Sequence, residues 1–216
     1  MPHLPAVDMV LADPPYGMAF RSNYRTVRHK PIEGDDGDMG WVERFASAAY
    51  STAKENTAHY VFCSFHGIDT FKRELGKFFN VKNVLVWEKN NTSMGDLRGD
   101  FAPKVEFVLF LHRGRRLING TRDPNIFKFR KTGNRLHPTQ KPVDMCSYLI
   151  EKFSDAGNTV LDPFLGSGTT AIAAERSGRR WIGIEKEQKY CDITIKRLEE
   201  ESTLWQKKRK QPKSSK

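Results

Sequence analysis

The sequence predicts an α/β protein with one domain, in which a mostly parallel sheet is covered by helices on both faces. Short apolar runs typical of buried strands alternate with segments of helical period along most of the 216 residues. One such strand is followed by a glycine loop and a helix, an arrangement that brings the backbone close to a ligand at the carboxyl end of a parallel strand. The length favours a single core, and no run of 18 apolar residues could form a membrane span.

The first elements follow from local patterns. Val7–Ala12 is a short apolar run that ends at two prolines, so we expect a buried strand there. Gly17–Gly40 has mixed charge and no period, which indicates a loop. Trp41–Lys54 has apolar or small residues at helical spacing after three aspartates, and acidic residues favour a helix N-terminus.

The middle of the chain continues the alternation. His59–Phe65 is strand-like, and apolar residues at helical spacing between Ile68 and Phe78 predict the next helix. Two more strands are expected at Val81–Trp87 and Val105–His112.

The last third begins with a helix start. Thr139–Pro142 combines a possible cap residue with an early proline, and Val143–Phe153 then has apolar residues on one face. The remaining elements are expected as strand, helix, strand and helix, at Thr159–Asp162, Thr169–Ser177, Arg180–Glu185 and Gln188–Leu204.

The positive charge is concentrated in two segments. The net charge is +10, and residues 89–136 hold eleven Lys or Arg against four acidic residues. Residues 206–216 hold six Lys or Arg and no acid, and we expect this tail to be disordered. Such blocks suit a phosphate backbone, because binding to it is driven by counterion release; a solvated face is the simpler alternative. The three cysteines are far apart and fit a reducing cytosol, so a cytoplasmic protein is expected.

A glycine loop follows the strand at Thr159–Asp162. Gly166 and Gly168 lack a Cβ, so the chain can turn tightly and a ligand can approach. A dinucleotide loop would have a third glycine where Ala171 stands, and a phosphate-gripping loop would have lysine where Thr169 stands. S-adenosylmethionine has no phosphate and needs neither. Glu185 ends the next strand, nineteen residues after Gly166. In nucleoside-binding sheets an acid at about this sequence separation accepts hydrogen bonds from ribose hydroxyls.

The tetrapeptide Asp13-Pro14-Pro15-Tyr16 follows the first strand. The amino group of adenine is a poor nucleophile because its lone pair is delocalised into the ring. Acceptors on both amino hydrogens, the Asp13 carboxylate and the Pro14 carbonyl, would localise that lone pair, and two prolines stiffen the turn. Tyr16 offers a flat face for an extruded base. Catalysis would then be mostly positioning and desolvation, with no metal. An ordinary turn is the alternative for these four residues alone.

Together, in this order, the two motifs resemble the beta group of the DNA amino-methyltransferases, which methylate adenine N6 or cytosine N4. His137-Pro138-Thr139-Gln140-Lys141-Pro142 is similar to the family motif that lines the methionine end of the cofactor, and Trp87-Glu88-Lys89 and Lys104-Val105-Glu106 look like its mid-chain strands. The resemblance implies a Rossmann-like, S-adenosylmethionine-dependent methyltransferase fold with permuted motif order, in which the two motif strands are neighbours. The cofactor site it implies consists of His137, Thr139, Gln140, Lys141, Asp162, Pro163, Phe164, Gly166, Ser167, Gly168, Thr169, Thr170, Glu185 and Lys186.

The domain organisation expected from this resemblance is one catalytic domain over 1–205, with a target-recognition insertion at about 89–136 and the basic tail 206–216. Double-stranded DNA is the expected partner, bound by a monomer or homodimer. The residues expected to contact it are Arg98, Arg113, Arg115, Arg116, Arg130 and Lys131.

The leading hypothesis is an adenine N6 methyltransferase that flips its base out of duplex DNA and belongs to an orphan or restriction-modification system. Asp at the first motif position favours adenine, since the cytosine enzymes more often carry Ser. Cytosine N4 methylation, RNA methylation and a poorly active DNA-binding homologue are the alternatives. Family members usually carry a further strand and a Gly-Asp pair ahead of the catalytic strand, whereas six residues precede Val7 here, so we expect weaker cofactor binding or compensation elsewhere.

Overall fold

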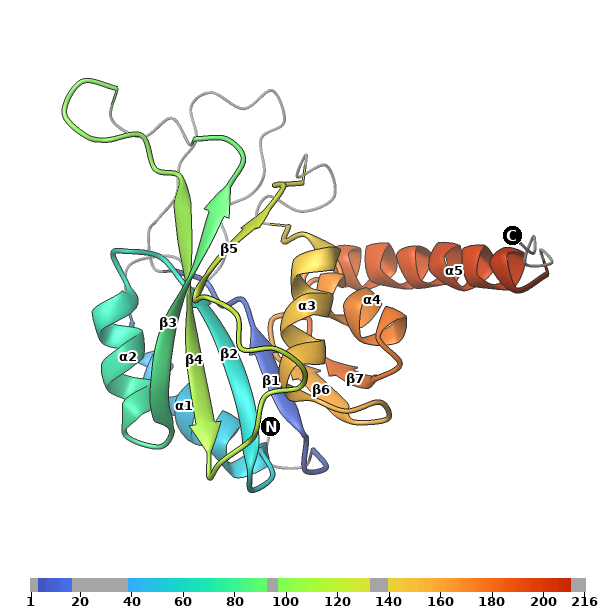
Figure 1. The fold of residues 1–216 in the computed structure, drawn as a ribbon, viewed down its shortest axis with the longest axis horizontal. Helices are drawn as coiled ribbons and strands as arrows, with labels where there is room; N and C mark the ends of the chain where they lie inside the picture. Colours follow the sequence, from blue (N-terminus) through green and yellow to red (C-terminus); the bar gives the residue numbers. More distant parts are fainter. Residues whose placement is uncertain (1–3, 17–38, 93–96, 133–139, 211–216) are drawn as a thin grey trace.

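The computed structural model describes residues 4–16, 39–92, 97–132 and 140–210, with side chains in the last helix to Thr203. The described strands form one sheet of seven strands in the order β5-β3-β4-β2-β1-β6-β7 (Figure 1). β4 runs against its two neighbours, and the other described strands run in one direction. The strands are β1 (Met9–Ala12), β2 (Thr57–Cys63), β3 (Asn80–Lys89), β4 (Val105–Arg113), β5 (Ile126–Phe129), β6 (Thr159–Asp162) and β7 (Arg180–Gly183).

Helices cover both faces of this sheet. α1 (Trp41–Thr52) and α2 (Ile68–Gly76) pack on one face, where Val10 and Ala12 of β1 contribute to the core. α3 (Val143–Phe153) and α4 (Thr169–Arg176) pack on the other, against Met9 and Leu11 of the same strand. Successive residues of β1 thus face opposite layers, which explains why the strand is apolar throughout. α5 (Gln188–Lys210) lies beside α4 and extends past it (Figure 1).

The expected fold class and alternation of elements are confirmed, with shifts at several ends. β6 has the expected bounds, whereas β2 begins and ends two residues earlier than expected, and α3 begins at Val143, just after Pro142. Most of the loop expected at Gly17–Gly40 lies outside the described residues. No helix in the described ranges is long and apolar enough to cross a membrane.

The structure differs from expectation in two details near the basic segments. The last helix continues from Leu204 to Lys210, so residues 206–210 are helical rather than disordered. Lys, Arg and Gln favour helix, and the first helix-breaking residue is Pro212. Residues 89–136 contain β4, where a strand was expected, and the further strand β5, which was not expected.

The two motif strands are neighbours, as expected. β1 pairs in parallel with β6, with Met9 opposite Val160 and Val10 opposite Leu161. From β1 the chain continues to β2 on one side, and from β6 to β7 on the other, so the connections diverge here. A ligand crevice is expected outside the carboxyl ends of such strands. We call this side of the sheet the carboxyl edge.

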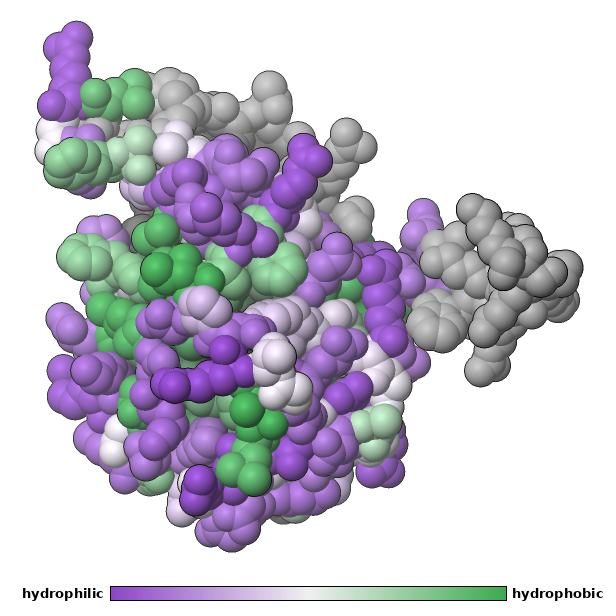
Figure 2. Space-filling model, in the orientation of Figure 1, coloured by the Kyte–Doolittle hydropathy of each residue, from purple (hydrophilic) through white to green (hydrophobic). Residues whose placement is uncertain are grey.

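Loops that follow β2 and β3 also reach the carboxyl edge. Phe65 follows β2, and residues 97–104, which precede β4, project from the body (Figure 1). Figure 2 shows hydrophobic groups on this projecting part, where Leu97 and Phe101 are exposed. The carboxyl edge is therefore bordered by a protruding loop with apolar side chains.

Candidate active site

Asp13 stands at the carboxyl edge, directly after β1, and both of its carboxylate oxygens are engaged. The Tyr16 hydroxyl donates to Oδ1 at 2.8 Å, and Nζ of Lys141 donates to Oδ2 at 2.7 Å. Lys141 also donates to the Tyr16 hydroxyl at 3.2 Å. The residues of the first motif are thus held by a lysine that precedes α3, 128 positions along the chain.

Lys141 lies between two carboxylates in a largely buried position. Its Nζ is 3.3 Å from Oε2 of Glu106 on β4, and Nζ of Lys89 on β3 is 3.4 Å from Oε1 of the same glutamate. The Lys141 ammonium also lies 5.1 Å from the centroid of the Phe62 ring. These contacts place alternating charges from three parts of the chain behind Asp13.

The charges in this cluster shift one another's pKa values. Burial opposes the charge on Lys141, but Asp13 and Glu106 outweigh it and raise the pKa of Lys141, which stays an ammonium ion. Burial also opposes the charge on Glu106, but Lys141 and Lys89 outweigh it and lower the pKa of Glu106. Burial raises the pKa of Asp13, and the Lys141 ammonium opposes that shift. Tyr16 keeps its proton, because burial and then the Asp13 charge raise its pKa.

The glycine loop follows β6 and is fixed from two sides. The amide of Gly166 donates to Oε2 of Glu185 at 2.8 Å, and its carbonyl accepts from Oγ1 of Thr194 at 3.2 Å. Arg197 donates to the carbonyl of Ser167. β7 and α5 therefore hold the backbone of the loop in place.

Gly168 needs to be glycine for two reasons. Its φ is +80°, in the left-handed region that L side chains rarely adopt, and a Cβ here would lie 2.5 Å from Cγ2 of Thr194. The turn places the N-terminus of α4 at the carboxyl edge. This supports the expected use of glycine at this position.

Asp162 ends β6 beneath the loop. Its Oδ1 accepts a hydrogen bond from the amide of Phe164 at 2.9 Å, and burial raises its pKa to about 7. The charge of Asp13 contributes to that rise, so the first and second motifs lie within electrostatic reach of each other. Phe164 packs on Trp41 and Phe45 of α1.

The loop also offers groups for a nucleoside ligand. Ser167, Thr169 and Thr170 are buried at the start of α4. Among the described residues, Oγ1 of Thr169 is a buried oxygen with no hydrogen-bond partner. An unsatisfied buried hydroxyl is costly, so a ligand polar group is a fitting partner. The Glu185 carboxylate, half-buried and already oriented by Gly166, is the second such group.

For several of the other expected cofactor residues, the structure gives only their exposure or a backbone contact. Pro163 is half-buried in the loop, Lys186 is exposed after β7, and the carbonyl of Gln140 accepts from Oγ1 of Thr132 at 3.0 Å. His137 and Thr139 lie outside the described residues. Lys141, expected along the cofactor, has its ammonium on Asp13 instead, a contact that sequence reasoning missed.

The expected DNA-contacting residues fall on two opposite edges of the sheet. Arg98 lies in the loop between β3 and β4, and Arg130 and Lys131 follow β5, so these three lie toward the carboxyl edge. Residues 113–116 follow β4, which runs the other way, and Arg113 pairs with Thr57 at the start of β2.

Arg113, Arg115 and Arg116 make contacts within the fold at the edge opposite Asp13. Arg113 donates to the carbonyls of Tyr50 and Ala53 at 2.6 and 2.7 Å, which joins β4 to the end of α1. Arg116 donates to Asp155 at 2.7 Å beyond α3. The amide of Arg115 donates to the side chain of Asn56 at 3.0 Å. These contacts serve the fold, and the reversal of β4 carries the residues away from Asp13.

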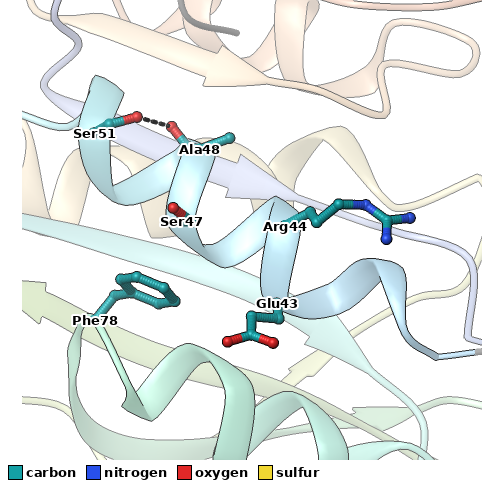
Figure 3. A pocket seen from close by; sticks show the side chains of 6 residues that line it. All are labelled: Glu43, Arg44, Ser47, Ala48, Ser51 and Phe78. Atoms are coloured by element: carbon teal, nitrogen blue, oxygen red, sulfur yellow. Dashed lines mark hydrogen bonds between the residues drawn. The ribbon is translucent and has the colours of Figure 1, made fainter.

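A hollow of about 430 Å³ lies elsewhere, on the outer side of α1 (Figure 3). It is lined by Glu43, Arg44, Ser47, Ala48, Ser51 and Phe78. None of the motif residues lines it. We do not assign it to the site.

Sequence reasoning did not select Glu106, Lys89, Thr194 or Arg197. The first two stand in segments already noted for their family likeness, so buried charges at the ends of neighbouring strands were the available signal. No comparable signal marked Thr194 or Arg197, because their roles depend on how α5 packs against the loop.

Known proteins resemble this chain over most of its length. The model of a DNA methylase family, N6_N4_Mtase, matches residues 7–122 and 120–196. "Putative methylase YubD" of Escherichia coli K12 is 36% identical over 196 residues, which cover 89% of this chain and 82% of that protein. "Type II methyltransferase M2.DpnII" of Streptococcus pneumoniae is 28% identical over 228 residues, covering 91% and 84%.

Solved structures of DNA methyltransferases are also similar to this chain. The crystal structure of the M1.HpyAVI–SAM complex has a TM-score of 0.69 and 27% identity, with 90% of both chains covered. The PvuII DNA methyltransferase, described as cytosine-N4-specific, has a TM-score of 0.71 at 16% identity over 95% of this chain and 87% of its own, and shows the fold alone.

Proposed function

We propose the following reaction for this chain, which belongs to the N6/N4 DNA methylase family: it transfers a methyl group to the N6 amino group of adenine in duplex DNA, with the base flipped out of the helix. The family acts on DNA and uses S-adenosylmethionine, the donor of the methyl group. Adenine as the target base, the flipping step and the roles of individual residues are our proposal.

One observation carries the proposal: the two motifs meet at the carboxyl edge. Asp13 follows β1 and the glycine loop follows β6, and these strands are hydrogen-bonded neighbours. Burial and, to a smaller extent, the Asp13 charge raise the pKa of Asp162 at the base of the loop, so the two carboxylates interact electrostatically. A base amine held at Asp13 would then lie beside a cofactor held by the loop.

The proposed cofactor site uses groups that are already oriented. When bound, S-adenosylmethionine supplies a methyl group on a positively charged sulfur. Glu185 would accept hydrogen bonds from its ribose, and Oγ1 of Thr169 would find the partner that it lacks among the described residues. His137, Thr139, Gln140 and Lys186 remain predicted cofactor contacts.

The proposed catalytic step rests on Asp13 and Pro14. Tyr16 and Lys141 fix the carboxylate, and each of its oxygens can still accept a further hydrogen bond. Asp13 and the Pro14 carbonyl would accept the two amine hydrogens and localise the lone pair on nitrogen. Burial raises the pKa of Asp13, which suits a group that also takes the proton released as the new bond forms.

DNA would approach at the carboxyl edge. Arg98, Arg130 and Lys131 lie on the segments that border this edge, and Leu97 and Phe101 are exposed beside Arg98. Cationic side chains would bind the phosphates, and exposed apolar side chains suit contact with unstacked bases.

Transfer of a labelled methyl group tests the proposal. The protein is incubated with labelled S-adenosylmethionine and either duplex DNA or RNA, and the product is digested to nucleosides and separated. We expect label in N6-methyladenine from DNA. Label in N4-methylcytosine would contradict the proposed base, label in RNA alone the proposed substrate, and the absence of label from both the proposed activity.

A further inference from the structure

Behind Asp13 lies a chain of buried charges that the reaction above does not explain. It runs from Asp13 to Lys141, from Lys141 to Glu106 and from Glu106 to Lys89, at 2.7, 3.3 and 3.4 Å. The side chains of Lys141 and Lys89 are 7% and 6% exposed, and that of Glu106 is 21% exposed. We call these four residues the ion-pair chain.

Stability alone is a poor reason for such an arrangement. Removing a charge from water costs several kcal/mol per ion, and apolar residues of similar size often stabilise a fold as well or better. Oε2 of Glu106 also has no hydrogen-bond partner within the described part of the chain, although it faces Lys141. A carboxylate held between two largely buried lysines therefore calls for a reason besides stability.

The geometry shows what Glu106 does to its neighbours. Lys141 has a carboxylate on each side, so its ammonium is held between Asp13 and Glu106. Lys89 in turn balances the charge of Glu106 from the end of β3. Without Glu106, Lys141 would keep its contacts with Asp13 and Tyr16 but would lose the second carboxylate, which holds the ammonium from the other side.

The ion-pair chain also connects Asp13 to the strand ends that carry the β3–β4 loop. Lys89 is the last residue of β3 and Glu106 the second residue of β4, and the segment between them contains Arg98. A shift of these strand ends would move Glu106 and Lys89, and so the anchor of Lys141. Asp13 is thereby mechanically linked to the β3–β4 loop.

We propose that Glu106, supported by Lys89, is a positioning residue: it holds Lys141 against Asp13 so that the carboxylate is aimed at the base amine. This inference rests on the proposed function. It assigns a role to two strand residues that touch neither the proposed cofactor nor the base.

The matched control is Glu88, the neighbour of Lys89 on β3. It also carries two lysine partners, Lys104 at 2.7 Å and Lys128 at 3.3 Å, but these are half-exposed and exposed and do not reach Asp13. Glu88→Gln thus removes the same charge from the same strand pair, outside the ion-pair chain.

The experiment measures single-turnover methyl transfer at saturating DNA and cofactor, together with both dissociation constants and the melting temperature. We expect Glu106→Gln to slow transfer about 10- to 100-fold, the usual effect of a misplaced catalytic group, with both dissociation constants within about twofold of wild type. Glu88→Gln should transfer at the wild-type rate.

A charge-balanced double variant separates positioning from folding. Glu106→Gln leaves Lys89 buried without its carboxylate, and adding Lys89→Gln removes that charge. We expect the double variant to recover the melting temperature while transfer stays slow. Recovery of the rate along with stability would overturn the proposal, as would an unchanged rate in Glu106→Gln. If Asp13→Ala also transferred normally, the proposed function itself would fail; if Asp13→Ala were inactive, only this inference would.

Discussion

The amide of Gly166 donates a hydrogen bond to Oε2 of Glu185 at 2.8 Å, which ties the glycine loop after β6 to the end of β7. The other oxygen, Oε1, accepts from the amide of Glu187 at 2.9 Å. The carboxylate is thus oriented before any ligand arrives, and such preorganisation reduces the entropic cost of binding.

Replacing Glu185 should weaken the cofactor site. We expect Glu185→Ala to raise the dissociation constant of S-adenosylmethionine about 10- to 100-fold, because two hydrogen bonds to ribose are lost and the loop loses its anchor. Isothermal titration calorimetry measures this. Glu187→Ala, two positions along and exposed, serves as the control and should bind normally. Equal affinities in the two variants would contradict the ribose assignment.

A methyl group at Gly168 should damage the loop in two ways. Gly168→Ala has to adopt φ +80° and places Cβ against Thr194, so we expect a loss of about 2–4 kcal/mol in the free energy of unfolding, as well as weaker cofactor binding. Gly178→Ala has a similar φ of +71° but open space around its Cβ, and should cost about 1 kcal/mol. Denaturant unfolding of both variants measures the difference, and equal losses would rule out the clash.

Asp162 should make the stability of the ligand-free protein depend on pH. Its pKa rises from 3.8 to about 7 on burial, so between about pH 4 and pH 7 the folded state keeps a proton that the unfolded state has released. Its contribution to stability is therefore lost as pH rises through this window, by about 1.4 kcal/mol per pH unit at most. His59, whose pKa burial lowers to about 3, acts in the opposite direction.

Comparison with Asp162→Asn isolates this effect, because the amide oxygen can still accept from Phe164. The stability difference between variant and wild type should increase in favour of the variant from pH 4 to pH 7. A difference that does not change with pH would mean that Asp162 titrates normally.

The two groups of arginines should respond differently to truncation. Arg130→Ala should weaken DNA binding and reduce the salt dependence of the binding constant by about one phosphate contact. Arg113→Ala should leave that salt dependence unchanged and lower the free energy of unfolding by about 1–3 kcal/mol, since the carbonyls of Tyr50 and Ala53 lose their donor. Fluorescence anisotropy at several salt concentrations and thermal melting test both. A changed salt dependence of DNA binding in Arg113→Ala would mean that Arg113 contacts a DNA phosphate.

Much of the fold could be predicted because its strands are buried on both faces. Val7–Ala12 and Thr159–Asp162 are apolar runs with clear turn signals after them, so their existence and their ligand-facing ends were evident. β5 was missed because Ile126–Phe129 has only four residues, one of them Lys128, and lies in a segment rich in basic residues. The strand forms through pairing with β3, which no local pattern reveals.

The site residues could be predicted where a motif directly follows a strand. They could not be predicted where their position depends on the direction in which a strand runs. Asp13 and the glycine loop follow their strands directly. The sequence does not reveal that β4 runs against β2, so it could not show that Arg113 lies at the edge opposite Asp13. Likewise, Lys141 contacts Asp13 because the fold brings the residues before α3 close to the end of β1. The spacing of the two residues along the chain does not reveal this contact.

The most direct test of the central claim is the methyl-transfer rate of Asp13→Ala in a single turnover, with DNA and cofactor both bound at saturation. We expect a loss of at least about 100-fold with DNA affinity nearly intact, because the amine loses its acceptor while the phosphate contacts remain. Transfer at the wild-type rate would contradict the account, since the carboxylate at the end of β1 would then have no part in the reaction.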